Sequence, residues 1–304
     1  MSTLAVLTPS FRGDVERFAD LHRSVLHCTD DDVVHYVVVP DLDVPMFERL
    51  QSGRLVVRGT SSLLPRRYVS TYGPVRLLRR APVVGRSVPK VEAVNVRRPW
   101  PPVRGWILQQ IVKYEAATRL DADVVLFADS DVLLVRHLTA EDFVRDGVVR
   151  FYRGADPLTP DLVRHAMWHR VSRRLLGLPP EHDDRDYVSS FVAWDPHIAR
   201  SVRDRVEAVT GLPWQDAMSR NLHFSEWMLY GCYVDNLGSA RDRSFTETTT
   251  RCRSHWGTIP LDERTAEEFM ASVAPDDLAI LIQSVSGTPE HVRRRVVEGL
   301  SVAL

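Results

Sequence analysis

The stretch that most constrains this chain is residues 120–136, where two apolar runs enclose a pair of aspartates. Residues 124–127 are apolar, Asp129-Ser130-Asp131 follows, and residues 132–135 are apolar again. Apolar runs of about four to eight residues bounded by polar ones are typical of buried strands. Carboxylates between such strands are costly unless neutralised, and two aspartates one residue apart can converge on a divalent cation. The alternative is a plain turn, where Asp is common.

Length, charge and cysteine usage exclude several classes of protein. The 304 residues suffice for one large α/β domain or two small ones. The net charge of -1 gives no overall field for nucleic acid, so we expect no nucleic-acid partner. We also expect no signal peptide and no integral membrane segment. Three separated cysteines indicate buried free thiols and a cytoplasmic protein, whereas nothing indicates an oligomeric state.

The first sixty residues predict the start of a parallel sheet. Strands are expected at 4–7, 35–39 and 55–57, with Pro9 ending the first and Asp14 capping the helix that follows. Ligands bind beyond the carboxyl ends of strands in such sheets. Thr8 to Asp14 and Asp129 to Asp131 both lie at such ends. Neither G-x-G-x-x-G nor a P-loop motif occurs, which disfavours an ordinary dinucleotide site.

Residues 60–105 differ from the rest because they hold ten basic residues against one acid, Glu92, a net charge of +9. Seven prolines interrupt them, so we expect a long basic excursion rather than a separate domain. One interpretation is a loop that faces an anion such as a phosphate. The other is a solvated surface loop.

Periodicity and end signals place the later elements. A helix at 106–120 carries Gln109, Gln110 and Lys113, and Ser225 can cap a helix with Glu226 in its first turn. His165 and His169 have metal-ligand spacing but lack the Glu of H-E-x-x-H, so a surface or core role is favoured. The other expected elements are strands at 148–152, 187–194 and 278–282, helices at 161–176, 198–209, 214–218, 263–273 and from Thr288-Pro289, and a loop at 246–253.

Six pieces, spread from the first strand to about residue 231, form one combination: Thr8-Pro9-Ser10 with Gly13-Asp14, 35–40, 105–113, 127–136, 186–188 and 224–231. With them the chain resembles glycosyltransferases of the GT-A fold, and more narrowly a bacterial family of uncharacterised glycosyltransferase-like proteins. The resemblance implies a single Rossmann-like α/β domain over 1–304, with a mainly parallel central sheet flanked by helices. Residues 1–135 would bind a nucleotide sugar and 136–304 the acceptor.

The resemblance also implies a metal-dependent sugar transfer to a hydroxyl of a small-molecule or glycan acceptor. Asp131 would coordinate Mn²⁺ or Mg²⁺ on the donor diphosphate, Asp129 would hold the ribose or the metal, and His255 would complete the metal site. The base and ribose would lie against Thr8, Pro9 and Ser10. The further candidates for donor binding are Asp14, Gln110, Lys113 and Ser130.

Glu226 is the candidate general base for an inverting reaction, in which an acceptor hydroxyl needs a base within hydrogen-bond reach. A helix N-terminus keeps Glu ionised but lowers its basicity, so burial has to compensate. Retention is the open alternative.

Two other functions compete with sugar transfer. A haloacid-dehalogenase-like phosphatase would use Asp129 as nucleophile, but it expects Thr or Val where Leu133 stands, and its motif sits near the first strand. A non-catalytic module that binds a nucleotide sugar or glycan would keep the fold without turnover. A domain whose acids only form turns would bind no ligand through a metal.

Overall fold

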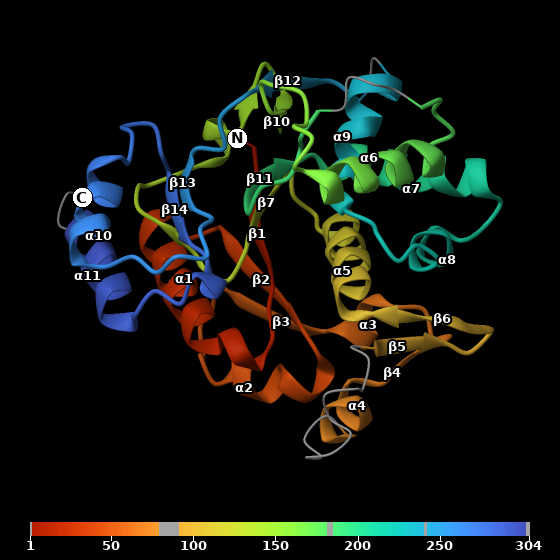
Figure 1. Cartoon of the computed structure of the whole chain (residues 1–304), viewed down its shortest axis with the longest axis horizontal. Coiled ribbons are helices and arrows are strands. Elements are labelled where there is room, and N and C mark those ends of the chain that lie inside the picture. Colours follow the sequence, from red (N-terminus) through yellow and green to blue (C-terminus); the bar gives the residue numbers. More distant parts are fainter. Residues whose placement is uncertain (1, 79–90, 181–184, 240–241, 302–304) are drawn as a thin grey trace.

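The computed structural model describes residues 2–78, 91–180, 185–239 and 242–301. Its centre is a five-stranded sheet in the order β11-β7-β1-β2-β3 (Figure 1). The four strands from β7 to β3 are parallel and β11 is antiparallel, which confirms the predicted α/β fold with a mainly parallel sheet. The bounds are β1 (Leu4–Pro9), β2 (Val34–Val39), β3 (Leu55–Gly59), β7 (Val124–Ala128) and β11 (Phe191–Trp194).

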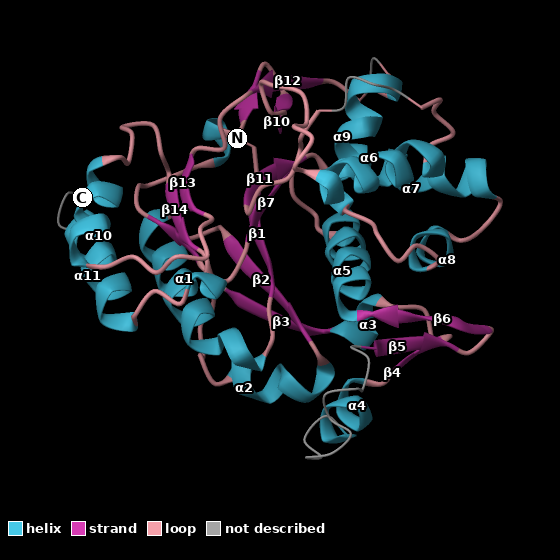
Figure 2. Cartoon of the chain, viewed as in Figure 1, coloured by secondary structure: helices cyan, strands magenta, loops and turns pink. Residues whose placement is uncertain are grey.

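Both faces of the central sheet are covered, which explains why its strands are continuous apolar runs. Along β7, Val125 and Phe127 pack into a core with α5, while Val124, Leu126 and Ala128 pack into a second core with α1. The two helices flank the sheet on opposite sides (Figure 2). The main covering helices are α1 (Val15–Cys28), α5 (Gly105–Arg119), α7 (Pro196–Thr210) and α9 (Glu226–Leu237).

Three smaller sheets surround the central one. They are β4 (Tyr68–Ser70), β5 (Val91–Asn95) and β6 (Arg98–Arg104); β8 (Val132–Leu134), β13 (Cys252–His255) and β14 (Ala279–Ile282); and β9 (Val144–Arg145), β10 (Val148–Tyr152) and β12 (Ser244–Glu247). Because β7 belongs to the central sheet and β8 to another, residues 129–131 are where the chain passes between two sheets.

The remaining helices are short or lie on the periphery. They are η1 (Arg12–Asp14), η2 (Asp41–Asp43), α2 (Val44–Glu48), α3 (Thr60–Leu63), α4 (Tyr72–Leu78), η3 (Ala140–Asp142), α6 (Val163–Leu175), α8 (Trp214–Ser219), α10 (Glu263–Ala271), η4 (Ser284–Ser286) and α11 (Glu290–Ser301).

β1 ends at Pro9, as expected, although it is two residues longer than the predicted 4–7. Pro9 still pairs with Val38, whereas β7 pairs with β1 only as far as Leu7, so the missing N–H of Pro9 breaks no bond to β7. Two expectations about caps were wrong. Asp14 precedes α1 but makes no capping bond. Ser225 precedes α9, yet its hydroxyl is buried without a hydrogen-bond partner among the described residues.

Three stretches differ from the predicted secondary structure. The excursion at 60–105 is not one long loop, because its described parts form α3, α4 and the β4-β5-β6 sheet; Arg79, Arg80, Arg86 and Lys90 lie outside the described residues. Residues 187–190 are not strand, because β7 offers no partner beyond Ala128. The predicted loop at 246–253 contains the end of β12 and the start of β13, whose partners are distant in sequence.

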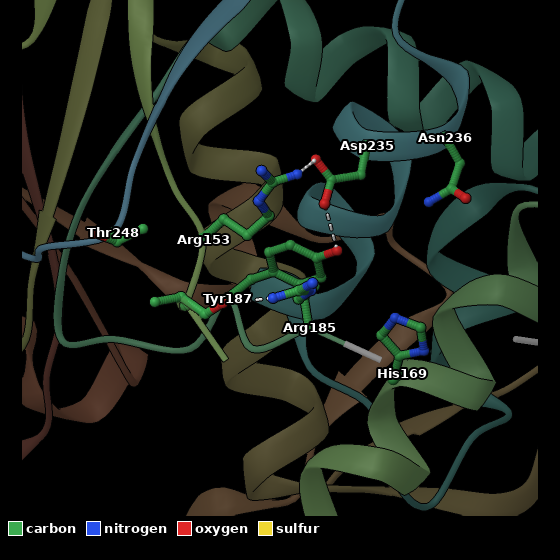
Figure 3. Close-up of a pocket in the computed structure, with 9 residues that line it drawn as sticks. Arg153, His169, Arg185, Tyr187, Asp235, Asn236 and Thr248 are labelled. Carbon is green, nitrogen blue, oxygen red and sulfur yellow. Dashed lines mark hydrogen bonds and ion pairs between the residues drawn. The ribbon is translucent and has the colours of Figure 1, made fainter. Parts of the chain in front are cut away.

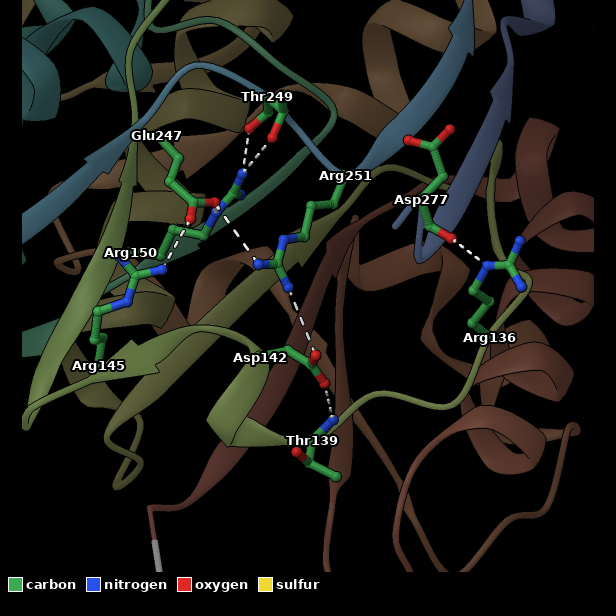
Figure 4. A network of polar contacts seen from close by, with 9 residues as sticks. All are labelled: Arg136, Thr139, Asp142, Arg145, Arg150, Glu247, Thr249, Arg251 and Asp277. Carbon is green, nitrogen blue, oxygen red and sulfur yellow. Dashed lines mark hydrogen bonds and ion pairs between the residues drawn. The ribbon is translucent and has the colours of Figure 1, made fainter. Parts of the chain in front are cut away.

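A network of arginines fastens the β12-β10-β9 sheet (Figure 4). Arg150, almost fully buried, donates to Glu247 at 2.6 Å, and Arg145 reaches the same carboxylate at 3.3 Å. Arg251 bridges Glu247 and Asp142 at 3.8 and 3.6 Å. The carboxylate of Glu247 thus neutralises the buried guanidinium of Arg150, whose burial without a partner would cost free energy.

Two further findings concern cysteines and membrane spans. Cys28, Cys232 and Cys252 are all buried, and none of them forms a disulfide. Within the described ranges, no helix combines the length and apolarity needed to cross a bilayer.

Candidate functional site

The order of the strands places a ligand site between β1 and β7. The chain proceeds from β1 outward to β2 and β3, and then returns to β7 on the other side of β1. Ligands of open α/β sheets bind beyond the carboxyl ends of the strands at such a reversal. Ser10 and Asp129 directly follow the two strands at this point, so the predicted loops do meet at one edge.

Three carboxylates gather at this edge: Asp14, Asp129 and Asp131, called the acidic cluster below. Burial, together with the negative charges of Asp129 and Asp14, raises the pKa of Asp131 to about 6, although the Ser284 N–H at 2.9 Å and the backbone N–H of Asp131 itself stabilise the carboxylate. Burial also raises the pKa of Asp14, although Arg17 lies 3.3 Å from its carboxylate. Arg17 thus contacts Asp14 and Lys113 contacts Asp129, whereas Asp131 forms no ion pair among the described residues.

The donor chemistry of the acidic cluster suits a metal ion in part. Closely spaced carboxylates that destabilise one another's charge suit a hard divalent cation, which takes oxygen ligands. The predicted third ligand does not join them: His255 Nε2 lies 2.9 Å from the carbonyl oxygen of Ile259. Among the described residues, no three His, Cys, Asp or Glu side chains are arranged to hold a metal. Asp129 and Asp131 fit a cation, whereas the full set with His255 is not assembled.

The serines of the two loops brace the site. Ser130 donates to Ser10 Oγ at 2.9 Å and to the carbonyl oxygen of Pro9 at 3.4 Å. Thr8 differs from the prediction because it is buried, and its hydroxyl donates to the carbonyl oxygen of Ala128 at 2.8 Å. Thr8 thus lies beneath the site and joins β1 to β7, instead of contacting a ligand.

A buried histidine pair continues from Thr8 into the protein. Since the Thr8 hydroxyl donates to Ala128, it accepts from His35 Nε2 at 2.9 Å, and His35 Nδ1 then accepts from His22 Nδ1 at 3.0 Å. Burial lowers the pKa of His22 to about 4 and holds that of His35 well below its usual value. Both imidazoles are consequently neutral at physiological pH.

A cleft of about 680 Å³ adjoins the acidic cluster, and we call it the edge cleft. Pro9, Ser10 and Asp14 line it, so three of the predicted donor-binding residues reach an open cavity. The other lining residues are Phe11, Val38, Pro40, Thr60, Tyr72, Glu92, Arg104, Gly105, Trp106, Leu108, Gln109 and Val112.

Gln110, Lys113 and Glu226 form a second polar group, the sealed cluster, behind the acidic one. Lys113 Nζ lies 3.0 Å from Glu226 Oε1 and 3.4 Å from Asp129 Oδ1. The Gln110 amide, with its nitrogen toward the carboxylate, donates to Glu226 Oε1 at 2.8 Å. The Glu226 side chain is only 1% exposed, and burial raises its pKa against the lowering effect of Lys113. Gln110 and Lys113 therefore bind protein groups, and neither lines the edge cleft.

Several residues of the edge cleft were not predicted from the sequence. Asp43 is fully buried and holds Arg12 at 2.7 Å and the Tyr72 hydroxyl at 3.0 Å, which ties the β1–α1 loop to α4. Arg104 and Glu92 come from the basic excursion. The basic composition of that stretch indicated an anion-facing surface, but nothing local predicted which residues reach the cleft.

A smaller pocket of about 290 Å³ lies at the end of α9 (Figure 3). Asp235 accepts from Arg153 at 3.1 Å and from the Tyr187 hydroxyl at 2.8 Å, while His169 also lines the pocket. His165 is paired with Asp186 at 3.1 Å. His165 and His169 thus lie against different groups, one beside Asp186 and the other in the pocket.

The structure is similar to solved glycosyltransferases. One is the galactosyltransferase LgtC in complex with donor and acceptor sugar analogs, with 11% identity, a TM-score of 0.43, and coverage of 99% of this chain and 96% of that one. Another is mouse xyloside xylosyltransferase 1 in its apo form, with 8% identity, a TM-score of 0.43, and coverage of 94% and 99%. TM-scores and identities this low do not indicate the activity of this chain.

Sequence comparisons reach a family without a named activity. No curated protein matches the chain. A family model described as "Family of unknown function (DUF6492)" matches residues 3–265. Because that match spans most of the sequence, the chain belongs to this family.

Proposed function

We propose that the protein transfers a sugar from a nucleotide-sugar donor to a hydroxyl of a small-molecule or glycan acceptor, with a divalent cation as cofactor. The observation that carries the proposal is the acidic cluster at the strand reversal, which opens beside a cleft of about 680 Å³. A nucleotide fits a cleft with apolar walls and a few polar groups. Its diphosphate then needs a countercharge beside three carboxylates, and a cation supplies it.

Asp129 and Asp131 would hold the Mn²⁺ or Mg²⁺. When bound, the cation stabilises the negative charge that develops on the leaving diphosphate. Contacts from two different parts of the chain hold the two carboxylates in place: Lys113 contacts Asp129, and the Ser284 N–H contacts Asp131. The hydrogen bond between Ser130 and Ser10 fixes the spacing of the two loops.

The donor and acceptor would bind different halves of the chain. Every residue that lines the edge cleft precedes residue 113, which supports residues 1–135 as the donor-binding half. Residues 136–304 would then supply the acceptor site. Catalysis by Glu226 as the base of an inverting reaction stays a prediction, because its carboxylate is buried against Lys113. In this conformation Glu226 is a positioning residue, since it orients Lys113 and through it Asp129.

Thermal unfolding with nucleoside diphosphates tests the proposal. UDP, GDP, TDP, CDP and ADP would each be added with and without Mn²⁺ to the wild type and to Asp131→Ala. A ligand that binds only the folded protein raises its stability by mass action, by about 2.7 kcal/mol at a hundred times Kd. We expect one nucleotide to raise Tm only with Mn²⁺ and only in the wild type.

A matched variant separates a local effect from a general one. Asp32 is an exposed acid in the turn before β2 and is not part of the acidic cluster, so Asp32→Asn should respond like the wild type. If no nucleotide raises Tm in any combination, the acids only form a turn. If nucleotide binds but no sugar is released or transferred, the protein is a binding module. Trapping of a phosphorylated Asp129 would indicate a phosphatase.

A further inference from the structure

The hairpin formed by β5 and β6 ends in an exposed apolar and basic tip. Val96 and Trp100 are 61% and 78% exposed, and Arg97, Arg98 and the intervening Pro99 are exposed between them. In Figure 1 this hairpin extends away from the central sheet, at the lower right. A large aromatic side chain at the end of a projecting hairpin makes little contribution to a core, so another role is needed.

Charge is distributed very unevenly between this region and the rest of the chain. Residues 60–105 carry +9, whereas the whole chain carries -1, so the remainder carries -10. Arg97, Arg98 and, on the facing segment, Arg220 form no ion pair within the described ranges. By contrast, Arg150 and Arg251 of the β12-β10-β9 network share Glu247. The arginines of the hairpin therefore keep their charge available for an external anion.

A hollow of about 250 Å³ lies at the base of the tip, between the hairpin and α8. Arg97, Arg98, Trp100 and Arg220 line it. The one acid of the hollow, Asp216, is already occupied: it accepts from Arg67 at 2.9 Å, from the Tyr68 hydroxyl at 2.7 Å and from the Asn95 amide at 3.0 Å. The hollow thus presents three unpaired guanidinium groups around one indole.

We propose that the β5–β6 hairpin docks the protein on an anionic lipid surface, with Trp100 and Val96 at the interface and a headgroup phosphate in the hollow. Tryptophan favours the headgroup level of a bilayer, and basic side chains near an anionic surface strengthen binding by about five-fold each. Guanidinium groups bind phosphate oxygens with paired hydrogen bonds. A single-stranded nucleic acid would instead need several aromatic rings along a groove, and the described tip offers one.

Vesicle co-sedimentation tests this docking. The probes are phosphatidylcholine vesicles and vesicles in which one quarter of the lipid is phosphatidylglycerol. The wild type should bind only the second kind, and less at high salt, because salt screens exposed charges. We expect Arg97→Gln/Arg98→Gln to weaken binding by about twenty-five-fold at low salt. Trp100→Ser should weaken vesicle binding by the same factor at low and at high salt, since it removes an apolar contact.

Two controls keep the result specific. Trp256 is an exposed tryptophan elsewhere, and Arg294 is an exposed arginine of α11. Trp256→Ser and Arg294→Gln should bind vesicles like the wild type, and thermal unfolding should show that every variant is folded. Equal binding of wild type and hairpin variants overturns the proposal. The proposal is also overturned if inorganic phosphate raises the thermal stability of the protein but vesicles do not bind it, or if the protein binds an oligonucleotide and no vesicles.

Discussion

The acidic cluster and the sealed cluster both contain carboxylates and touch at the 3.4 Å contact between Lys113 and Asp129, yet they differ in charge balance. In the sealed cluster, Glu226 meets a lysine and an amide inside the protein. In the acidic cluster, Asp131 meets two backbone N–H groups and the charges of two other aspartates. Glu226 is therefore paired with a cation, whereas Asp131 forms no ion pair within the described part of the chain. The difference shows that the partners of an acid, more than its position at a strand or helix end, indicate where a cation is needed.

The largest effect should come from breaking the sealed cluster. Glu226→Leu removes the closer of the two carboxylates that contact Lys113 and leaves the 3.4 Å contact to Asp129, and an uncompensated buried charge costs about 3–5 kcal/mol. We expect urea unfolding to show a loss of about 3 kcal/mol. The double variant Lys113→Met/Glu226→Leu should recover most of this loss, because no buried charge is left. A Glu226→Leu variant as stable as the wild type would contradict a sealed pair.

The acidic cluster should respond in the opposite direction. In metal-free protein, Asp131→Asn removes a charge that burial and Asp129 disfavour, so stability should rise by about 1–2 kcal/mol. Thermal unfolding in EDTA at neutral pH measures this. Asp129→Asn is the matched control, since it also loses the contact with Lys113 and should bring little gain. A loss of stability in Asp131→Asn would mean that its carboxylate is already satisfied.

A smaller effect concerns the histidine pair beneath the acidic cluster. The pKa of His22 is lowered to about 4 in the folded protein, so the unfolded chain binds more protons between that value and the ordinary one near 6.5. Stability should therefore fall as pH decreases through this window, by roughly 1–2 kcal/mol between about pH 7 and 5. Urea unfolding across this range should show a flatter profile for His22→Gln. An unchanged slope would assign the acid sensitivity to other groups.

The sequence predicted those parts of the fold that depend on local pattern. The apolar runs around Asp129 and Asp131 became β7 and β8, and the helix that begins at Glu226 lies where its first turn was expected. Pairings between distant segments were not predictable. The contact of Lys113 with Glu226 spans 113 residues, and nothing near either residue shows it.

Other errors have the same origin. The proline-rich stretch 60–105 lacks strand signals, but its segments pair with one another as β4, β5 and β6. Thr8 was expected to face a ligand because it ends a strand, and it instead donates to the neighbouring β7. His255 was assigned by analogy, and the turn after β13 supplies its partner, Ile259. Burial and partner choice in each case depend on tertiary contacts.

The passage of the chain from β7 to β8 has a mechanical consequence. The Asp129 N–H donates to the carbonyl oxygen of Ser190 in the segment before β11, while the Asp131 carboxylate accepts from the Ser284 N–H in the segment after β14. One cation held by both carboxylates would link the central sheet to the β13-β14-β8 sheet. Substitutions that destabilise the β13-β14-β8 sheet, at positions that touch no ligand, would then weaken the binding of the cation and of the donor together. The β13-β14-β8 sheet thus contributes as much to the proposed cation site as the central sheet does.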